Sequence, residues 1–166
     1  NALPDTKIGL IIVNDGSQRL DEKTSVNRIS EFIPGLQWIT YADNCGKGYA
    51  LREGVKISVA DFIMYTDIDW PYTQESVMAV FHELQNEKDA VIGVRDEEYY
   101  THLPPARSRI SKLLRKINAG LLRLKVADTQ AGLKGFRNGV KEIFLFTTIN
   151  RYLFDLEFIF LLSVRN

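Results

Sequence analysis

The sequence predicts an α/β protein with a mostly parallel, Rossmann-like sheet and helices on both faces. Two observations predict it. Short apolar, β-branched runs alternate along residues 7–94 with segments of helical periodicity. Continuous apolar runs are typical of strands buried on both faces, and the alternation is typical of parallel strands joined by crossover helices. Ligands of such sheets bind beyond the carboxyl ends of the strands, so candidate chemistry is sought there.

The individual elements follow from periodicity and from cap and turn residues. Strands are expected at residues 7–13, 37–41, 62–66 and 90–94. Helices are expected at residues 24–33, at 47–60 and after Thr73, whose hydroxyl can cap the third. Beyond residue 98 the pattern predicts a basic amphipathic helix or helix pair at 107–125, a strand at 133–137 and a helix at 151–164.

Composition indicates one globular domain over residues 1–166 and excludes several classes of protein. Hydrophobic residues are 45% of the chain, and the formal net charge is zero, so no overall field favours nucleic acid. Cys45 has no partner for a disulfide, and two histidines argue against a zinc site. No run reaches the roughly 20 apolar residues of a membrane span, and no signal peptide is evident. A cytoplasmic protein is expected.

A candidate metal site follows the third strand. Asp67 and Asp69 come directly after the apolar run FIMYT, at a strand's carboxyl end. On an extended chain their side chains would face opposite ways, but in a turn they can converge on one cation. Hard carboxylate oxygens suit Mg²⁺ or Mn²⁺, with a diphosphate completing the coordination. The alternative is a solvated loop or a helix cap.

Two further strand ends carry candidate nucleotide-binding residues. In residues 13–17 (VNDGS), Asp15 can accept hydrogen bonds from a base or ribose, Gly16 permits a tight turn, and Ser17 can cap the segment after it. In residues 44–54 (NCGKGYALREG), small residues permit close ligand approach, and Lys47 adds a charge for phosphate near a helix N-terminus. Each alone also fits a purely structural turn. Together, the three strand ends supply what a nucleoside diphosphate needs.

These segments resemble those of family-2 glycosyltransferases. VNDGS is similar to their V-D-D-G-S strand end, NCGKGYALREG to N-x-G-K-G-x-A-x-R-x-G, and YTDID to their metal-binding D-x-D. Residues 128–134 (DTQAGLK) and 154–157 (FDLE) resemble the D-T-Q-x-G-x-K and F-D-x-E of the polyprenyl-phosphate branch, which includes dolichyl-phosphate glucosyltransferases. Order and spacing agree over about residues 8–164.

The resemblance implies a GT-A fold, a nucleotide-sugar donor and inversion at the sugar carbon. Asp15 would contact the base and Asp69 the metal, while Asp67 would contact donor and metal. The implied donor-binding residues are Asp15, Gly16, Ser17, Asn44, Lys47, Gly48 and Asp67. The family's first strand, with its P-x-Y-N-E signature, does not occur in the sequence, and continuation beyond Asn166 is expected.

The chain also departs from the family pattern. Asn14 stands where the first Asp of V-D-D-G-S is usual, which alters the expected base contacts. Trp70 and Pro71 follow the D-x-D where mannosyl-transferring relatives have polar residues, one of them a metal ligand. UDP-glucose is therefore favoured over GDP-mannose as the donor.

The acceptor side is expected in the basic segment 107–125. No acidic residue occurs between Glu98 and Asp128, and apolar residues recur at helical spacing. Such a helix can lie on an anionic membrane surface, and its arginines can grip a lipid phosphate. A helix packed on the core with a solvated basic face is the alternative. Arg107 and Arg109 are the predicted phosphate ligands, and the protein is expected at the cytoplasmic face of a membrane.

Asp128 and Gln130 are predicted to shape the acceptor site, and Asp155 and Glu157 are the candidate catalytic carboxylates. They could serve as a general base or orient basic residues. A phosphate oxygen is already anionic near neutral pH, whereas a sugar hydroxyl requires a base. The predicted reaction is a single displacement in which the acceptor phosphate attacks the anomeric carbon. The alternatives are transfer to a saccharide hydroxyl, a sugar-nucleotide nucleotidyltransferase, and a non-enzymatic Mg²⁺-binding module.

Overall fold

The computed structural model describes residues 6–18, 21–69, 72–93 and 131–165. The predicted basic helix over 107–125, with Arg107 and Arg109, lies outside the described residues, as do Asp128 and Gln130.

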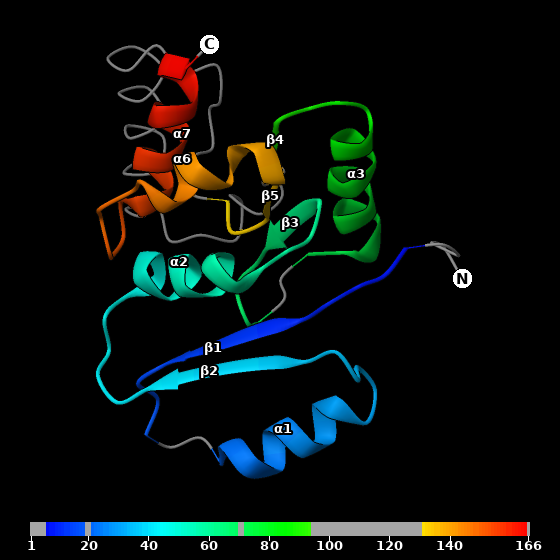
Figure 1. The fold of residues 1–166 in the computed structure, drawn as a ribbon, viewed down its shortest axis with the longest axis vertical. Coiled ribbons are helices and arrows are strands. Elements are labelled where there is room, and N and C mark those ends of the chain that lie inside the picture. Colours follow the sequence, from blue (N-terminus) through cyan, green and yellow to red (C-terminus); the bar gives the residue numbers. More distant parts are fainter. Residues whose placement is uncertain (1–5, 19–20, 70–71, 94–130, 166) are drawn as a thin grey trace, which may run out of the picture.

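Strands and helices alternate along the first part of the chain, as expected (Figure 1). The elements are β1 (Ile11–Asp15), α1 (Glu22–Ser30), β2 (Gln37–Tyr41), α2 (Lys47–Ile57), β3 (Phe62–Tyr65), α3 (Gln74–Gln85), β4 (Ala90–Ile92), β5 (Lys134–Arg137), η1 (Asn138–Val140), α6 (Lys141–Leu145) and α7 (Phe154–Arg165). Each predicted element in the described part of the chain is therefore present.

The strands form two groups. β1 and β2 pair in parallel, from Ile11 beside Gln37 to Asp15 beside Tyr41. β5 lies between β3 and β4 and runs antiparallel to both. Among the described strands, one pairing is parallel and two are antiparallel, so the predicted mostly parallel, Rossmann-like sheet is not confirmed. The strand predicted near 133–137 exists but is inserted in the opposite direction, an arrangement that the apolar content of LKGFR does not reveal.

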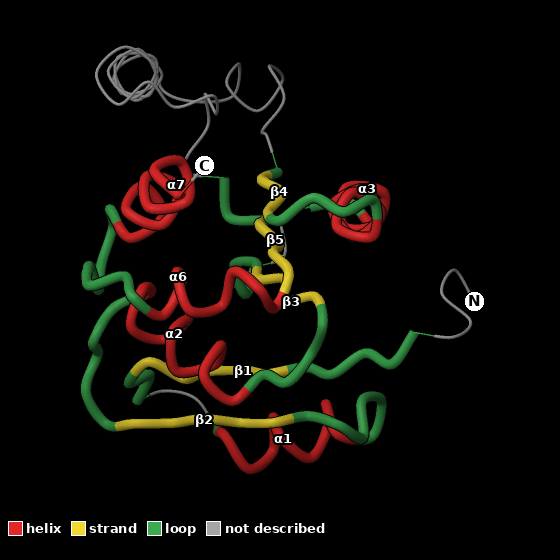
Figure 2. The backbone as a smooth tube through the Cα atoms, turned by 45° about the horizontal axis from the view of Figure 1, so that its top comes forward, coloured by secondary structure: helices red, strands yellow, loops and turns green. Residues whose placement is uncertain are grey.

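Helices cover both faces of the β3–β5–β4 sheet (Figure 2). Successive side chains of a strand point to opposite faces. Ile63 and Tyr65 accordingly pack with α2, α6 and α7, whereas Phe62 and Met64 pack with α3. α2 also covers β1, since a Cβ built on Gly54 would lie 3.3 Å from Val13 Cγ2. One helix therefore packs against strands of both groups, and its first residue, Lys47, lies at the candidate site.

Caps explain where two helices begin. The Thr73 hydroxyl accepts a hydrogen bond from Ser76 N, which confirms the predicted cap of α3. α1 starts at Glu22, two positions before the predicted Thr24, because the Asp21 carboxylate accepts from Thr24 N. An aspartate cap satisfies an amide that has no partner within the helix. Within the described residues, none of the helices is both long and apolar enough to cross a membrane.

Candidate active site

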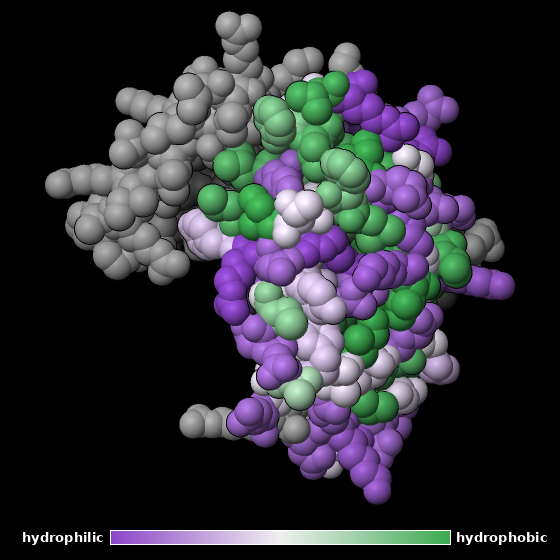
Figure 3. All heavy atoms as spheres, turned by 60° about the vertical axis from the view of Figure 1, so that its left-hand side comes forward, coloured by the Kyte–Doolittle hydropathy of each residue, from purple (hydrophilic) through white to green (hydrophobic). Residues whose placement is uncertain are grey.

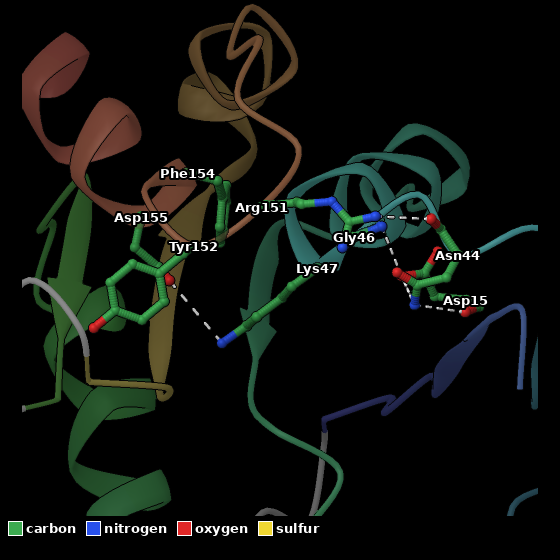
Figure 4. A pocket seen from close by; sticks show the side chains of 8 residues that line it. All are labelled: Asp15, Asn44, Gly46, Lys47, Arg151, Tyr152, Phe154 and Asp155. Atoms are coloured by element: carbon green, nitrogen blue, oxygen red, sulfur yellow. Dashed lines mark hydrogen bonds and ion pairs between the residues drawn. The ribbon is translucent and has the colours of Figure 1, made fainter.

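A pocket of about 730 Å³ opens where the carboxyl ends of the strands meet α2 and α7 (Figure 4). It is lined by Asp15, Asn44, Gly46, Lys47, Arg151, Tyr152, Phe154 and Asp155. Acidic and basic side chains therefore share one wall, contributed by segments more than a hundred residues apart in sequence. Its position matches the expectation that chemistry lies beyond the strand ends.

Asp15 organises the loop that leads into α2. Its carboxylate accepts hydrogen bonds from Cys45 N at 2.7 Å, Gly46 N at 2.8 Å and Asn44 Nδ2 at 3.0 Å. The loop can curl around this carboxylate because Gly46 adopts a φ of 104°, which side-chain-bearing residues rarely adopt. In the ligand-free arrangement Asp15 thus shapes the pocket wall, and its predicted contact with a base stays a prediction.

Lys47 links two of the predicted acidic residues. Its ammonium lies 2.7 Å from Asp67 Oδ1 and 4.0 Å from Asp155 Oδ2. Asp67 follows β3 and Asp155 begins α7, so three elements converge on this lysine. The predicted grouping of Lys47 with the D-x-D aspartate is therefore present in the folded chain, with Asp155 at its edge.

Asp155 belongs to a buried polar cluster. Its side chain is 5% exposed, and Oδ1 lies 2.7 Å from the Lys134 ammonium and accepts from the Tyr65 hydroxyl at 3.0 Å. Lys134 is 1% exposed and also donates to Ala131 O. Buried charges persist in proteins when they are paired and hydrogen-bonded, as they are here. The cluster fixes the start of α7 against β3 and β5.

Alkaline pH is expected to weaken the fold through Tyr65. Burial, followed by the Asp155 charge and its hydrogen bond, raises the pKa of Tyr65 well above its ordinary value of 10.0. Above pH 10 the tyrosine ionises in the unfolded chain while staying protonated in the folded one, so stability falls as pH rises. Urea titrations from pH 8 to 11 should show a shallower decline for Tyr65→Phe. The matched control is Tyr152→Phe, at an exposed tyrosine, which should keep the original decline.

Gly132 brings the DTQAGLK segment against the D-x-D segment. A Cβ built on Gly132 would lie 2.1 Å from Asp67 Oδ2, and Gly132 N donates to the Tyr72 hydroxyl at 2.6 Å. Only a residue without a side chain fits there without displacing the aspartate. Asp67 and Gly132, which belong to two different motifs and lie more than sixty positions apart in the sequence, thus meet in the fold.

Gly46 and Gly48 allow the backbone of residues 149–150 to pack closely against the start of α2. Cβ atoms built on them would lie 2.5 Å from Asn150 O and 2.5 Å from Ile149 O respectively. Gly48 N also donates to Asn150 O at 2.8 Å. The sequence interpretation assigned these small residues to ligand approach. The geometry gives them another function, which is close packing of α2 against the segment before α7.

Gly48→Ala is therefore expected to destabilise the protein by about 1–3 kcal/mol, because overpacking forces backbone shifts. The added methyl group meets Ile149 O and, at 2.7 Å, Phe154 Cβ. Urea unfolding followed by circular dichroism measures the change. Gly139→Ala is the control, since a Cβ there meets no atom within 4 Å. Equal stability of the two variants would contradict the packing argument.

Glu157 holds the segment before α7. Its carboxylate accepts from Thr148 N at 2.9 Å, from Ile149 N at 2.8 Å and from the Thr148 hydroxyl at 2.9 Å. Partial burial raises its pKa, but the hydrogen bonds from Ile149 and Thr148 outweigh that effect, so the pKa lies below its ordinary value. Glu157 does not line the pocket, and its described contacts are with this loop.

The departure at Asn14 has a local explanation. Its amide nitrogen donates to Glu22 Oε1 at 2.5 Å and to the Thr40 hydroxyl at 3.2 Å, and its amide oxygen accepts from Ser17 N. An aspartate would place a second carboxylate against Glu22, whereas asparagine can donate. Asn14 lines a second pocket of about 530 Å³, together with the predicted donor residues Gly16 and Ser17.

Asp67 and Asp69, which follow β3, are oxygen donors of the kind that a divalent cation prefers when a bound diphosphate supplies further donors. Among the described residues, no group of three or more His, Cys, Asp or Glu side chains could hold a metal. Asp67 is 42% exposed and Asp69 is exposed, so both carboxylates are accessible. Two hard oxygen donors suit Mg²⁺ or Mn²⁺ when a diphosphate and water fill the other positions. The metal assignment stays a prediction on this donor set.

The structure brings some predicted residues together and adds others. Asp15, Asn44, Lys47 and Asp155 line the pocket, and Asp67 contacts it through Lys47. The site and its supporting hydrogen bonds also include residues to which the sequence patterns gave no role. These are Arg52, Tyr65, Lys134, Arg151 and Tyr152. A lysine within the otherwise apolar LKGF run was a signal for a buried ion pair. No comparable signal marked Arg151 or Tyr152.

Comparison with known proteins identifies the family. The family model described as glycosyl transferase family 2 matches residues 1–144, which include α2, the D-x-D segment and β5. A search of curated proteins found no match. The match ends before α7 and therefore does not include Asp155 and Glu157.

Proposed function

Because this chain belongs to glycosyl transferase family 2, we propose that it transfers a sugar from a nucleotide sugar, with UDP-glucose favoured, to a polyprenyl phosphate with inversion. Membership implies the GT-A fold, an enzyme and a nucleotide-sugar donor. The donor's identity, the lipid-phosphate acceptor and metal dependence are the proposed parts.

The observation that carries the proposal is the meeting of motifs at Asp67. Lys47 of the glycine-rich segment pairs with its Oδ1, and Gly132 of the DTQAGLK segment lies against its Oδ2. Gly132, which belongs to the segment that resembles the polyprenyl-phosphate branch, therefore lies against Asp67, a candidate donor and metal residue. This arrangement supports a donor and an acceptor phosphate bound close together.

Four residues in and beside the pocket have distinct parts in the proposed chemistry. Asp67 and Asp69 would hold Mg²⁺ or Mn²⁺, which when bound offsets charge on the departing nucleoside diphosphate. Lys47 supplies a second positive charge at the same wall. Asp15 fixes the loop that carries Lys47, and the anionic acceptor oxygen attacks the anomeric carbon from the face opposite the diphosphate.

The surroundings of the two candidate catalytic carboxylates favour a phosphate acceptor over a sugar hydroxyl. Asp155 is paired with Lys134 and hydrogen-bonded by Tyr65, and Glu157 accepts hydrogen bonds from the 148–149 backbone. The hydrogen bonds from Ile149 and Thr148 lower the pKa of Glu157, which makes that carboxylate a weaker base. A phosphate oxygen needs no base, so the geometry supports positioning roles for both residues.

Apolar side chains beside the pocket support a lipid-linked acceptor. Tyr152 lines the pocket and is 69% exposed; Leu153, the following residue, and Ile149, three positions before Tyr152, are 46% and 37% exposed. Figure 3 shows one side of the molecule, on which hydrophobic side chains are most numerous in the upper part. The proposed acceptor ligands Arg107, Arg109, Asp128 and Gln130, and membrane contact through residues 107–125, remain part of the proposal.

The test is sugar transfer by the protein with Mg²⁺ or Mn²⁺ and a short polyprenyl phosphate. UDP-glucose and GDP-mannose are supplied in separate reactions, with a soluble oligosaccharide as the competing acceptor. A lipid-phosphate sugar formed from UDP-glucose, with inverted anomeric configuration by NMR, is the expected product. Transfer to the oligosaccharide alone would replace the acceptor class, and retained activity in excess EDTA would refute metal dependence.

A further inference from the structure

Arg52 is a buried arginine whose described hydrogen bonds all go to one loop. It lies in α2 and is 9% exposed. Its guanidinium donates to the Thr147 hydroxyl at 3.2 Å, to Ile149 O at 3.1 Å and to Asn150 Oδ1. A planar guanidinium that makes several hydrogen bonds fixes both position and orientation of its partner. The loop at residues 147–150 is thus held from the side of α2.

The same loop is held from α7 by Glu157. Its carboxylate accepts from the amides of Thr148 and Ile149 at 2.8–3.0 Å. The Arg52 charge also favours the ionised form of Glu157 and helps lower its pKa, although burial and the hydrogen bonds have larger effects. Two oppositely charged side chains on different helices therefore clamp one short loop, which in turn packs on Gly48.

The clamped loop leads directly to Arg151 at the pocket wall. Arg151 is exposed, lines the pocket beside Lys47 and donates to Asn44 O at 3.1 Å (Figure 4). Lys47 is paired with Asp67, whereas Arg151 has no carboxylate within ion-pair distance among the described residues. A guanidinium carries five N–H donors in a fork that matches phosphate oxygens, so most of its donors can face a ligand.

We propose that Arg151 binds a phosphate group of the ligand in this pocket, and that Arg52 is a positioning residue that acts through the 147–150 loop to place Arg151. The inference rests on the proposed function, because the phosphate is that of the donor's nucleoside diphosphate. Arg52 is not among the residues that line the pocket. Its contribution passes through Thr147, Ile149 and Asn150 to the next residue along the chain.

The experiment is a double-mutant cycle on nucleotide affinity. Binding of UDP and of GDP, each with Mg²⁺, is measured by titration calorimetry for the unsubstituted protein, Arg52→Lys, Arg151→Gln and the double variant. Arg151→Gln should weaken binding about 10- to 100-fold, since a charge-assisted hydrogen bond is lost. Arg52→Lys, which keeps the charge but loses the fork, should weaken it about 10-fold in the unsubstituted protein and less than about twofold in Arg151→Gln.

A second readout follows the loop without any ligand. Hydrogen exchange of the Thr148 and Ile149 amides should accelerate in Arg52→Lys and in Asn150→Ala. The Asn150→Ala substitution removes one hydrogen bond of the clamp and leaves the buried charge of Arg52 in place. Arg28→Gln, at an exposed arginine of α1, is the matched control and should change neither exchange nor affinity. Circular dichroism confirms that each variant is folded.

The possible results separate the two proposals. The positioning role would be overturned if Arg52→Lys reduced nucleotide affinity by the same factor in the unsubstituted protein and in Arg151→Gln. Unchanged hydrogen exchange of the Thr148 and Ile149 amides would overturn it as well. Unchanged affinity in Arg151→Gln would overturn its phosphate contact when UDP or GDP binds the unsubstituted protein. Binding of neither nucleotide would refute the proposed function and the phosphate assignment together, whereas the exchange data would still decide whether the clamp exists.

Discussion

Asp155→Ala is expected to lower the free energy of unfolding by about 3–5 kcal/mol, the usual effect of removing one partner of a buried ion pair. Asp155 is 4% exposed, and its carboxylate pairs with Lys134, which is 1% exposed, and accepts from Tyr65. The substitution leaves a buried ammonium without this carboxylate. Urea unfolding at pH 7, followed by circular dichroism, measures the loss.

Two further variants separate charge from packing. Asp155→Asn keeps an oxygen for Tyr65 but removes the charge, so it should still destabilise clearly. The double variant Lys134→Met with Asp155→Leu replaces the pair by apolar side chains and should recover much of the stability, because the desolvation of both charges disappears. If Asp155→Ala unfolded at the same urea concentration as the unsubstituted protein, the buried pair would contribute nothing to the fold.

Asp69→Ala is expected to reduce sugar transfer on the order of 100-fold or more, since it removes a proposed metal ligand next to the leaving diphosphate. Asp69 is exposed in the turn after β3, so the loss should occur without destabilisation. Asp67 is a less clear choice, because its substitution also breaks the pair with Lys47. Initial rates at several Mn²⁺ concentrations, with the urea midpoint of the same sample, test the assignment.

The matched control is Asp61→Ala. Asp61 is an exposed aspartate immediately before β3, at the end of the strand opposite to Asp69. It should leave transfer rates unchanged. A rate for Asp69→Ala equal to that of the control, at limiting metal, would show that Asp69 is not a ligand.

Local sequence patterns predicted the elements of this fold better than their arrangement. β2 begins and ends at the predicted residues, and the cap of α3 is at Thr73, because apolar runs and cap hydroxyls act over a few residues. The antiparallel insertion of β5 between β3 and β4 was not predicted. Strand direction depends on which edges are free to pair, and a short run such as KGFR carries no information on that.

For the candidate site as well, the sequence predicted some of the residues but not the tertiary contacts that hold them. The grouping of Asp15, Lys47 and Asp67 followed from strand ends, since those meet at one edge in an α/β protein. The sequence patterns indicated Asp155 and Glu157 as catalytic carboxylates but not their partners. Lys134 pairs with Asp155, and Arg52 binds the same loop as Glu157, only through tertiary packing. No spacing rule connects residues on β5 or α2 with α7.

The cross-connections that complete the pocket have a consequence for the order of folding. Hydrogen bonds from Arg52 to Thr147 and Asn150, and from Tyr65 to Asp155, join residues 90–98 positions apart. Closing such long loops loses chain entropy before any contact offsets it, so contacts of this kind slow folding. The β1–α2 half can form early from neighbouring residues, whereas the pocket wall appears only when α7 returns to it. We therefore expect the protein to become able to bind ligand only late in folding.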